Sequence, residues 1–235
     1  VFVMPRLDLN CDLGEGGPHD RALMPLITSA NIACAGHAGD LTTAVTALAR
    51  AKEAGVQVGA HPGFLDREHF GRRELQLPPD QLREMILIQV DFLRSLADAG
   101  AVRYLKPHGA LYNLACRDEA VARAVVDSAA MLGLPLLGLP GSKMEQLAQG
   151  RILFLREGYA DRRYTPEGLL GPRDRPDAFI ETPREAVAQA LRLLEEGRID
   201  SLCVHGDNPH AIDFAHALRD ELQSAGVTLR AFDVP

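Results

Sequence analysis

Short apolar runs alternate with longer amphipathic stretches along the chain. The apolar runs have the length and the aliphatic content of buried strands, and they predict strands at 2–10, 29–34, 56–60, 102–105, 134–139, 152–156, 199–204 and 227–232. Between them, residues at helical spacing predict helices at 41–54, 80–100, 118–132, 142–148, 182–196 and from 208 onward. Strands that alternate with helices in this way form right-handed βαβ units and a parallel sheet.

Local signals mark where several helices begin and end. Asp40 is a good N-cap for a helix that ends at Gly55, and Asp80 is the expected N-cap of the clearest amphipathic helix. Thr182 opens a capping box with proline at the first helical position. No linker, repeat or low-complexity segment divides the chain, so residues 1–235 are expected to form one domain.

Polar residues follow six of the eight predicted strands. In an open sheet, binding residues gather at a switch point between two or three strands. In a barrel, the carboxyl ends of nearly all strands meet at one mouth, so six contributing strands favour a barrel. Because 235 residues are few for a regular eightfold barrel, the sequence predicts an irregular, TIM-like (β/α) barrel of seven to eight parallel strands.

Composition excludes some classes of partner. The net charge of −7 argues against a nucleic acid or an anionic membrane surface, since either would select a basic surface. No apolar run reaches the roughly 18 residues needed to span a membrane. The four cysteines form no CxxC pair, which predicts reduced thiols in a cytoplasmic protein.

The end of the first strand carries a dense group of polar residues. Strand alternation places Asp8, Asn10 and Asp12 on one face, and Glu15 extends the set. Such a group could hold a metal ion or supply a general base. Alternatively, it fills the inside of a barrel with a satisfied polar network.

Four of the eight histidines lie just beyond a predicted strand, namely His37, His61, His108 and His205. A single histidine of this kind is usually structural, but four on one rim favour acid–base chemistry or ligand binding. The fourth strand is followed by Lys106, His108, Tyr112 and Asn113, which are costly to bury without partners.

Several features suit an anionic ligand. A helix is expected to begin just after His205 and Asp207, and backbone N–H groups at such a helix start favour a carboxylate or phosphate. Arg72, Arg73 and Arg162 could add positive charge, or they are ordinary surface residues. The chain has no Walker loop, no GxGxxG after a strand, no GxSxG and no HExxH, so any ATP is bound without a P-loop.

Eight segments resemble the LamB/YcsF family: DLNCDLGE at 8–15, SANIAC at 29–34, HAGD at 37–40, GAHPG at 59–63, FGRR at 70–73, KPHGALYN at 106–113, ADRRY at 160–164 and VHGD at 204–207. The resemblance covers essentially the whole chain. It implies an irregular barrel related to glycoside hydrolases and sugar deacetylases. It also implies ATP-dependent opening of 5-oxoproline to glutamate, in a 5-oxoprolinase complex with subunits B and C. Tyr159 stands where the family usually has phenylalanine, and Gly36 stands where it has the aromatic residue before His37.

The implied reaction suggests roles for these residues. We expect Lys106 and either Arg72 or Arg162 to neutralise phosphate charge. His61 or His108 would move protons, and a carboxylate from Asp8, Asp12 or Asp207 would activate water or hold Mg²⁺. The remaining residues expected to bind substrate or nucleotide are Asn10, Glu15, Asn31, His37, Asp40, Arg73, Tyr112, Asn113, Asp161 and His205.

Two other kinds of function stay open. One is a metal-dependent deacetylase or amidohydrolase that acts alone, with Asp12, His61 and a further histidine as ligands. The other is a subunit that binds a metabolite at its rim while a partner performs the chemistry.

Overall fold

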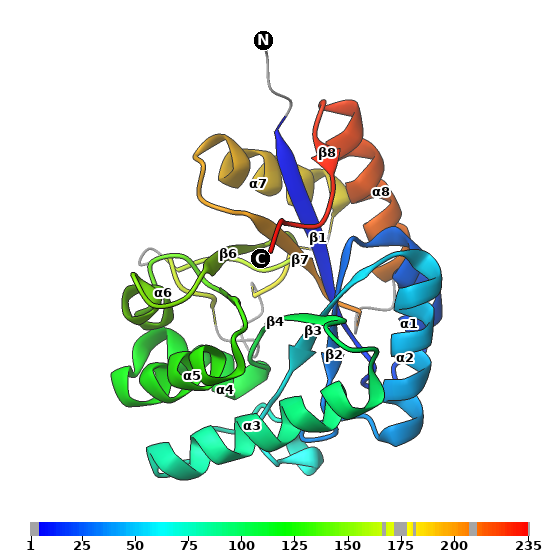
Figure 1. Cartoon of the computed structure of the whole chain (residues 1–235). Helices are drawn as coiled ribbons and strands as arrows, with labels where there is room; N and C mark the ends of the chain where they lie inside the picture. Colours follow the sequence, from blue (N-terminus) through cyan, green and yellow to red (C-terminus); the bar gives the residue numbers. More distant parts are fainter. Residues whose placement is uncertain (1–4, 166–167, 172–177, 181, 207–210, 235) are drawn as a thin grey trace.

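Seven parallel strands close into a barrel in the computed structural model of this protein, which describes residues 5–165, 168–171, 178–180, 182–206 and 211–234 (Figure 1). The barrel strands are β1 (Arg6–Leu13), β2 (Ser29–Ala33), β3 (Gln57–His61), β4 (Val102–Leu105), β5 (Leu136–Gly138), β6 (Phe154–Tyr159) and β7 (Ser201–Val204). Each pairs with the next in chain order, and β1 pairs with both β2 and β7, which closes the barrel. The two-residue strand β8 (Thr228–Leu229) pairs with the start of β1. The predicted irregular, TIM-like (β/α) barrel is confirmed.

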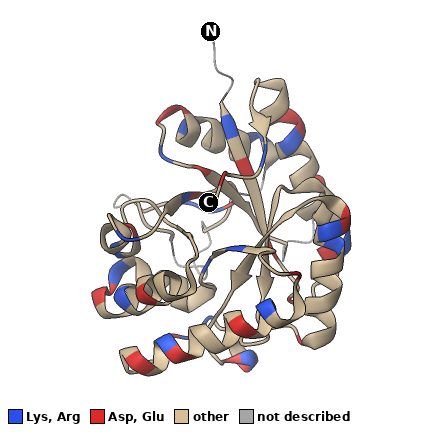
Figure 2. Ribbon diagram, in the orientation of Figure 1, with Lys and Arg blue, Asp and Glu red and all other residues tan. Residues whose placement is uncertain are grey.

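Helices surround the barrel (Figure 1). They are α1 (Asp20–Leu23), α2 (Leu41–Ala54), α3 (Pro79–Leu96), α4 (Gly109–Arg117), α5 (Glu119–Leu132), α6 (Lys143–Ala148), α7 (Pro183–Glu195) and α8 (Ala211–Ser224), with short 3₁₀ turns at Met24–Leu26 and Arg67–His69. Their buried faces are mainly alanine, leucine and valine, which pack in the layer between helices and strands. Figure 2 shows acidic and basic residues mixed along these helices.

The first strand separates the apolar layer from the barrel interior. Leu7, Leu9 and Cys11 belong to the hydrophobic core outside the strands. Asp8 and Asn10 alternate with them and bond to side chains of neighbouring strands inside the barrel. The period of two in a strand therefore directs the acidic face of β1 inward, as the sequence predicts.

Some predicted boundaries are wrong. β1 does not end at Asn10 but continues to Leu13, because residues 10–13 pair with 29–32 of β2. Asp80 is not an N-cap, because α3 begins at Pro79 and Pro78 occupies the N-cap position. The cap at Asp40 and the end at Gly55 are confirmed for α2. The predicted N-cap of the last helix, at 208–209, lies outside the described residues.

Two errors affect the site directly. Residues 109–117 form α4, a helix that the sequence analysis treats as a polar strand end. Leu111, Tyr112 and Ala115 on this helix are buried against the core, and that packing stabilises it. β6 does not end at residue 156, as predicted, but extends to Tyr159, so Glu157 lies within the strand.

The described part of the chain contains no helix that is long and apolar enough to cross a membrane. All four cysteines are buried, and none of them forms a disulfide.

Candidate active site at the barrel mouth

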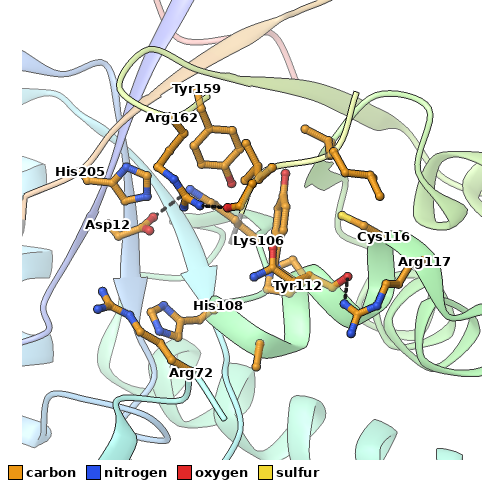
Figure 3. A pocket seen from close by; sticks show the side chains of 18 of the residues that line it. Asp12, Arg72, Lys106, His108, Tyr112, Cys116, Arg117, Tyr159, Arg162 and His205 are labelled. Carbon is orange, nitrogen blue, oxygen red and sulfur yellow. Dashed lines mark hydrogen bonds and ion pairs between the residues drawn. The ribbon is translucent and has the colours of Figure 1, made fainter. Parts of the chain in front are cut away.

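A pocket of about 420 Å³ opens at the carboxyl ends of the strands (Figure 3). Asp12, His61 and Tyr159 reach it from the ends of β1, β3 and β6. A second hollow, of about 310 Å³, is bordered by Glu15 and the glycine-rich segment after β1. The two cavities share Asp12, Arg72, His108 and His205. The mouth of the barrel is therefore one two-lobed site with these four side chains between the lobes.

Lys106 lies on the floor of the pocket and is almost completely buried. Its Nζ is 2.9 Å from Asp12 Oδ1 and 2.8 Å from Glu157 Oε1. Nζ also lies 3.3 Å from Cys203 Sγ. Burial alone would lower the pKa of Lys106, but the charge of Asp12 and the other anionic partners raises it well above its usual value. The ammonium group is therefore permanently charged and committed to its partners.

Asp12 joins the pocket to a hydrogen-bond network inside the barrel. Its Oδ1 accepts from Lys106 and, at 2.8 Å, from Asn31 Nδ2. Asn31 also donates to Asn10 at 2.8 Å and accepts from Tyr104 at 2.7 Å. Burial would raise the pKa of Asp12, but the adjacent His61 and Lys106 lower it well below its usual range. Asp12 is therefore an ionised carboxylate held in a fixed orientation.

Asp8 lies deeper in the barrel and does not line either cavity. Its carboxyl accepts from the hydroxyls of Thr28 and Ser29, each at 2.6 Å, and from Ser201. Burial raises the pKa of Asp8 to about 6, although these hydrogen bonds oppose the increase. The structure therefore places Asp8 in the polar filling of the barrel rather than at the mouth.

Two histidines at the mouth are fixed by backbone carbonyl groups. His61 Nδ1 donates to Lys106 O at 2.8 Å, and His108 Nε2 donates to Phe70 O at 2.9 Å. The other ring nitrogens, His61 Nε2 and His108 Nδ1, then face each other at 2.9 Å. Burial, together with two neighbouring histidines, lowers the pKa of His108 well below its usual value.

His37 and Glu15 complete this cluster. The His37 ring stacks on His108 with ring centres 3.6 Å apart, and Phe70 lies edge-on to His37 at 5.7 Å. His37 Nε2 is 3.0 Å from Glu15 Oε1. Gly71, with φ of +64°, lies so close that a Cβ would meet His37 Cβ at 2.6 Å. The stack therefore depends on a glycine at this position.

His205 and Asp161 form a second acid–base pair on the opposite side of Asp12. His205 Nδ1 donates to both carboxylate oxygens of Asp161, at 2.8 and 2.9 Å. The ring of Tyr159 stacks beside His205 with centres 5.6 Å apart. Because Nδ1 is committed to Asp161, the remaining nitrogen of His205 is the one available for proton transfer, and His205 lines both cavities.

The pocket is lined by Arg72, which is exposed, and by Arg162, which is buried. Arg72 lies over the Phe70 ring at 5.1 Å, and Arg162 lies over Phe179 at 5.2 Å. Figure 3 shows Arg72 near His108 and Arg162 near Tyr159, so the two cations lie on different walls. Planar guanidinium groups on two walls suit a ligand with carboxylate or phosphate groups.

The structure brings most of the predicted residues together. Those that line the main pocket are Asp12, His61, Arg72, Lys106, His108, Tyr112, Asn113, Arg162 and His205. Those that contact the lining residues from behind or beside are Asn10, Glu15, Asn31, His37 and Asp161.

Three predicted residues lie elsewhere. Asp8 is inside the barrel, below the mouth. Asp40 is an exposed N-cap of α2 that accepts from Thr43 N at 2.8 Å, so the assignment to substrate binding is not supported. Arg73 points to Asp66, with 3.4 Å between Nη2 and Oδ1, and lines neither cavity. Asp207 lies outside the described residues.

Two site residues were missed by sequence analysis. Glu157 is completely buried and pairs with Lys106, and its Oε2 accepts from Tyr159 OH at 2.8 Å. Tyr159 lines the pocket and places its ring 5.6 Å from Lys106 Nζ. The signal was the alternation of Leu155, Glu157 and Tyr159, which puts all three on one face once β6 is extended.

Comparison with known proteins gives a consistent result. The LamB/YcsF family model matches residues 7–234. A protein of Neisseria meningitidis serogroup C (strain 053442), named as the A subunit of 5-oxoprolinase, is 44% identical over 245 residues, which cover 97% of this chain and 100% of that protein. A protein of the same name from Methylococcus capsulatus is 44% identical over 247 residues, which cover 96% of this chain and 95% of that protein.

Solved structures agree with this assignment. The lactam utilization protein of Thermus thermophilus superposes with a TM-score of 0.90 at 39% identity, covering 97% of this chain and 100% of that one. A family 4 carbohydrate esterase from Streptomyces lividans superposes with a TM-score of 0.57 at 12% identity, covering 97% of this chain and 93% of that one. At this low identity the similarity shows a shared fold alone. The chain belongs to the LamB/YcsF family.

Proposed function

We propose that this chain is the A subunit of an ATP-dependent 5-oxoprolinase and that its barrel mouth opens the lactam ring of 5-oxoproline to give L-glutamate. The names of its relatives and of the Thermus thermophilus structure support a reaction on a lactam. The observation that carries the proposal is the arrangement of an ionised Asp12 between two sets of histidines at one pocket. That arrangement provides a fixed anion with proton donors and acceptors on both sides.

The chemistry of the substrate explains the need for ATP. A five-membered lactam is an unactivated amide, and its carbonyl carbon is a poor electrophile for water. Phosphorylation of the lactam oxygen by ATP would make the ring carbon electrophilic and release ADP. Water then adds to that carbon, and the ring C–N bond breaks with a proton transferred to nitrogen, which leaves γ-glutamyl phosphate. A second water hydrolyses this acyl phosphate and releases phosphate. The products are glutamate, ADP and phosphate.

The geometry modifies the roles of the charged residues. The ammonium group of Lys106 is buried and already contacts Asp12 and Glu157, so we assign it to holding Asp12 ionised rather than to binding phosphate. Arg72 and Arg162 line the open pocket and would meet the substrate carboxylate or a phosphate group.

Proton transfer is assigned to His205, which Asp161 orients through Nδ1. In this position its free nitrogen would accept a proton from the attacking water or return one to the leaving ring nitrogen. Asp161 would fix the tautomer and stabilise the charged imidazole, as a carboxylate does for a catalytic histidine elsewhere.

ATP and Mg²⁺ are proposed as co-substrates of the complete enzyme. Mg²⁺ is usually held by one or two carboxylates together with the nucleotide phosphates. The consumption of ATP and the four free cysteines both fit the cytoplasmic location that the sequence predicts.

The name of the relatives implies further subunits, and we propose subunits B and C as partners. The test is glutamate release from 5-oxoproline with ATP, measured for this chain alone, for B and C together, and for the full mixture. Glutamate and ADP in equal amounts from the full mixture alone support the proposal. Glutamate from this chain without partners would favour a stand-alone amidohydrolase. Full activity of B and C without it would favour a non-catalytic binding role.

A further inference from the structure

The histidine cluster leaves two imidazole lone pairs directed at each other. His61 gives its Nδ1 proton to Lys106 O, and His108 gives its Nε2 proton to Phe70 O. In neutral rings the remaining nitrogens carry no hydrogen, yet they lie only 2.9 Å apart in a buried position. Two facing lone pairs repel each other unless a cation lies between them or beside them.

Carboxylates add negative charge to the same place. Glu15 Oε1 is 3.4 Å from His108 Nδ1, and Asp12 Oδ2 is 3.3 Å from His61 Nε2. His37 donates from Nε2 to Glu15, which leaves its buried Nδ1 without a hydrogen-bond partner among the described residues. This tautomer of His37 is the favourable one, because burying a lone pair without a partner costs less free energy than burying an N–H group without one. His37 then orients Glu15.

The spacing of these donor atoms fits a small metal ion. One ligand atom each from Glu15, His37, His61 and His108 can be chosen so that all four lie within 4.8 Å of one another. Tetrahedral Zn²⁺, with bonds of about 2.0–2.1 Å, places its donor atoms roughly 3.3 Å apart. The measured 2.9 and 3.4 Å between the donors of His61, His108 and Glu15 bracket that value.

We propose that Glu15, His61 and His108 bind one divalent transition-metal ion, with Zn²⁺ the best match to the donor set. Two imidazoles and one carboxylate are a known ligand set for catalytic zinc, and they leave a coordination position for water or substrate. The backbone carbonyls behind His61 and His108 are typical outer-shell partners of metal-bound histidines. His37 acts as the outer-shell partner of Glu15.

A second group of metal-binding residue types, Asp12, Cys203 and His205, lies in the same mouth. Two of its members are already committed, because Cys203 and Asp12 contact the Lys106 ammonium. A metal ion there would have to compete with a buried cation, so we assign the metal to the histidine cluster.

Metal binding can be measured on this chain alone, without substrate or partner subunits. The purified full chain is stripped with EDTA and titrated with Zn²⁺ by calorimetry. It is also titrated with Co²⁺, whose absorption spectrum reports nitrogen and oxygen coordination. The variants are Glu15→Gln and His108→Gln, with His216→Ala as a matched control because His216 is exposed on α8. His205→Asn tests the second group. Far-UV circular dichroism and thermal melting establish that each variant is folded.

We expect one Zn²⁺ per wild-type chain and a melting temperature that rises when Zn²⁺ is added. Glu15→Gln and His108→Gln should weaken binding by more than about 100-fold, the upper end of the effect of outer-shell changes. His216→Ala and His205→Asn should bind as the wild type does. A folded wild-type chain that binds neither ion, as expected if the two nitrogens share a proton, would overturn the proposal. So would variants in the cluster that bind normally, or loss of binding only in His205→Asn. Because no glutamate is measured, this outcome is independent of the proposed oxoprolinase activity.

Discussion

Lys106 Nζ and Glu157 Oε1 lie 2.8 Å apart at the floor of the pocket, and both side chains are buried. Asp12 contacts the same ammonium group from the other side at 2.9 Å. One buried cation thus balances the buried Glu157 and the partly buried Asp12, and this charge arrangement fixes Asp12 beside the histidines.

Replacing Lys106 with Met is expected to destabilise the protein strongly. The change leaves Asp12 and Glu157 buried without their cation, and the loss of one partner from a buried pair typically costs about 3–5 kcal/mol. The double variant Lys106→Met/Glu157→Gln removes one of the two unpaired charges and should recover part of the loss. Urea denaturation measures the free energy of unfolding for both. A single variant as stable as the wild type would show that the ion pair has no structural role.

The stability of the protein should depend on Asp8 at mildly acidic pH. Its pKa is raised from 3.8 to about 6 in the folded protein. Between these values the folded state holds more protons than the unfolded state, so the Asp8 contribution to the free energy of unfolding falls as pH rises from about 4 to 6. The shift corresponds to about 3 kcal/mol.

The comparison with Asp8→Asn isolates this contribution. The free energy of unfolding of the wild type minus that of the variant, measured at several pH values, should decrease by up to about 3 kcal/mol between pH 4 and 7 and stay constant above. A difference that does not change with pH, or that increases, would contradict the raised pKa.

His205→Asn should lower the turnover of the reconstituted complex by about 10²–10⁴-fold, the usual contribution of a general acid or base. Asp161→Asn removes the carboxylate that orients His205 through Nδ1, so it should lower turnover as well. His216→Ala is the matched control. Turnover within a few-fold of wild type for His205→Asn would remove this residue from the proton-transfer role.

Asp40→Ala should affect stability and not activity. Asp40 caps α2 by accepting from Thr43 N, and it lines neither cavity. Loss of an N-cap in a chain of this size should lower the melting temperature by roughly 2–4 °C. Glutamate release by the complex that contains this variant is expected to match that of the wild type. A large loss of turnover would show that Asp40 takes part in substrate binding.

The barrel was predictable because polar residues recur at the ends of six separated strands, which only a closed arrangement brings together. The inward direction of Asp8, Asn10 and Asp12 followed from strand alternation in the same way. The number of strands in the barrel was harder to predict, because β8 has only two residues and pairs with the start of β1.

The errors have a physical cause in each case. Glu157 carries a charge that strand patterns normally exclude, and its contacts with Lys106 and Tyr159 make its place in β6 acceptable. Asp40 has the residue type of a ligand and the position of a helix cap, and the fold shows that it caps α2 and lines neither cavity. Facing nitrogens such as those of His61 and His108 depend on tertiary contacts 47 residues apart, which no local pattern encodes.

The central claim is that the lactam ring is opened at the mouth of this barrel. The most direct measurement is glutamate formation by the complex of this chain with subunits B and C, with Asp12→Asn compared with wild type after assembly is verified by size-exclusion chromatography. Asn keeps the shape of Asp12 but removes its charge. We predict an assembled complex whose glutamate formation falls by at least about 100-fold. An assembled Asp12→Asn complex that forms glutamate at the wild-type rate would place the chemistry in one of the partner subunits.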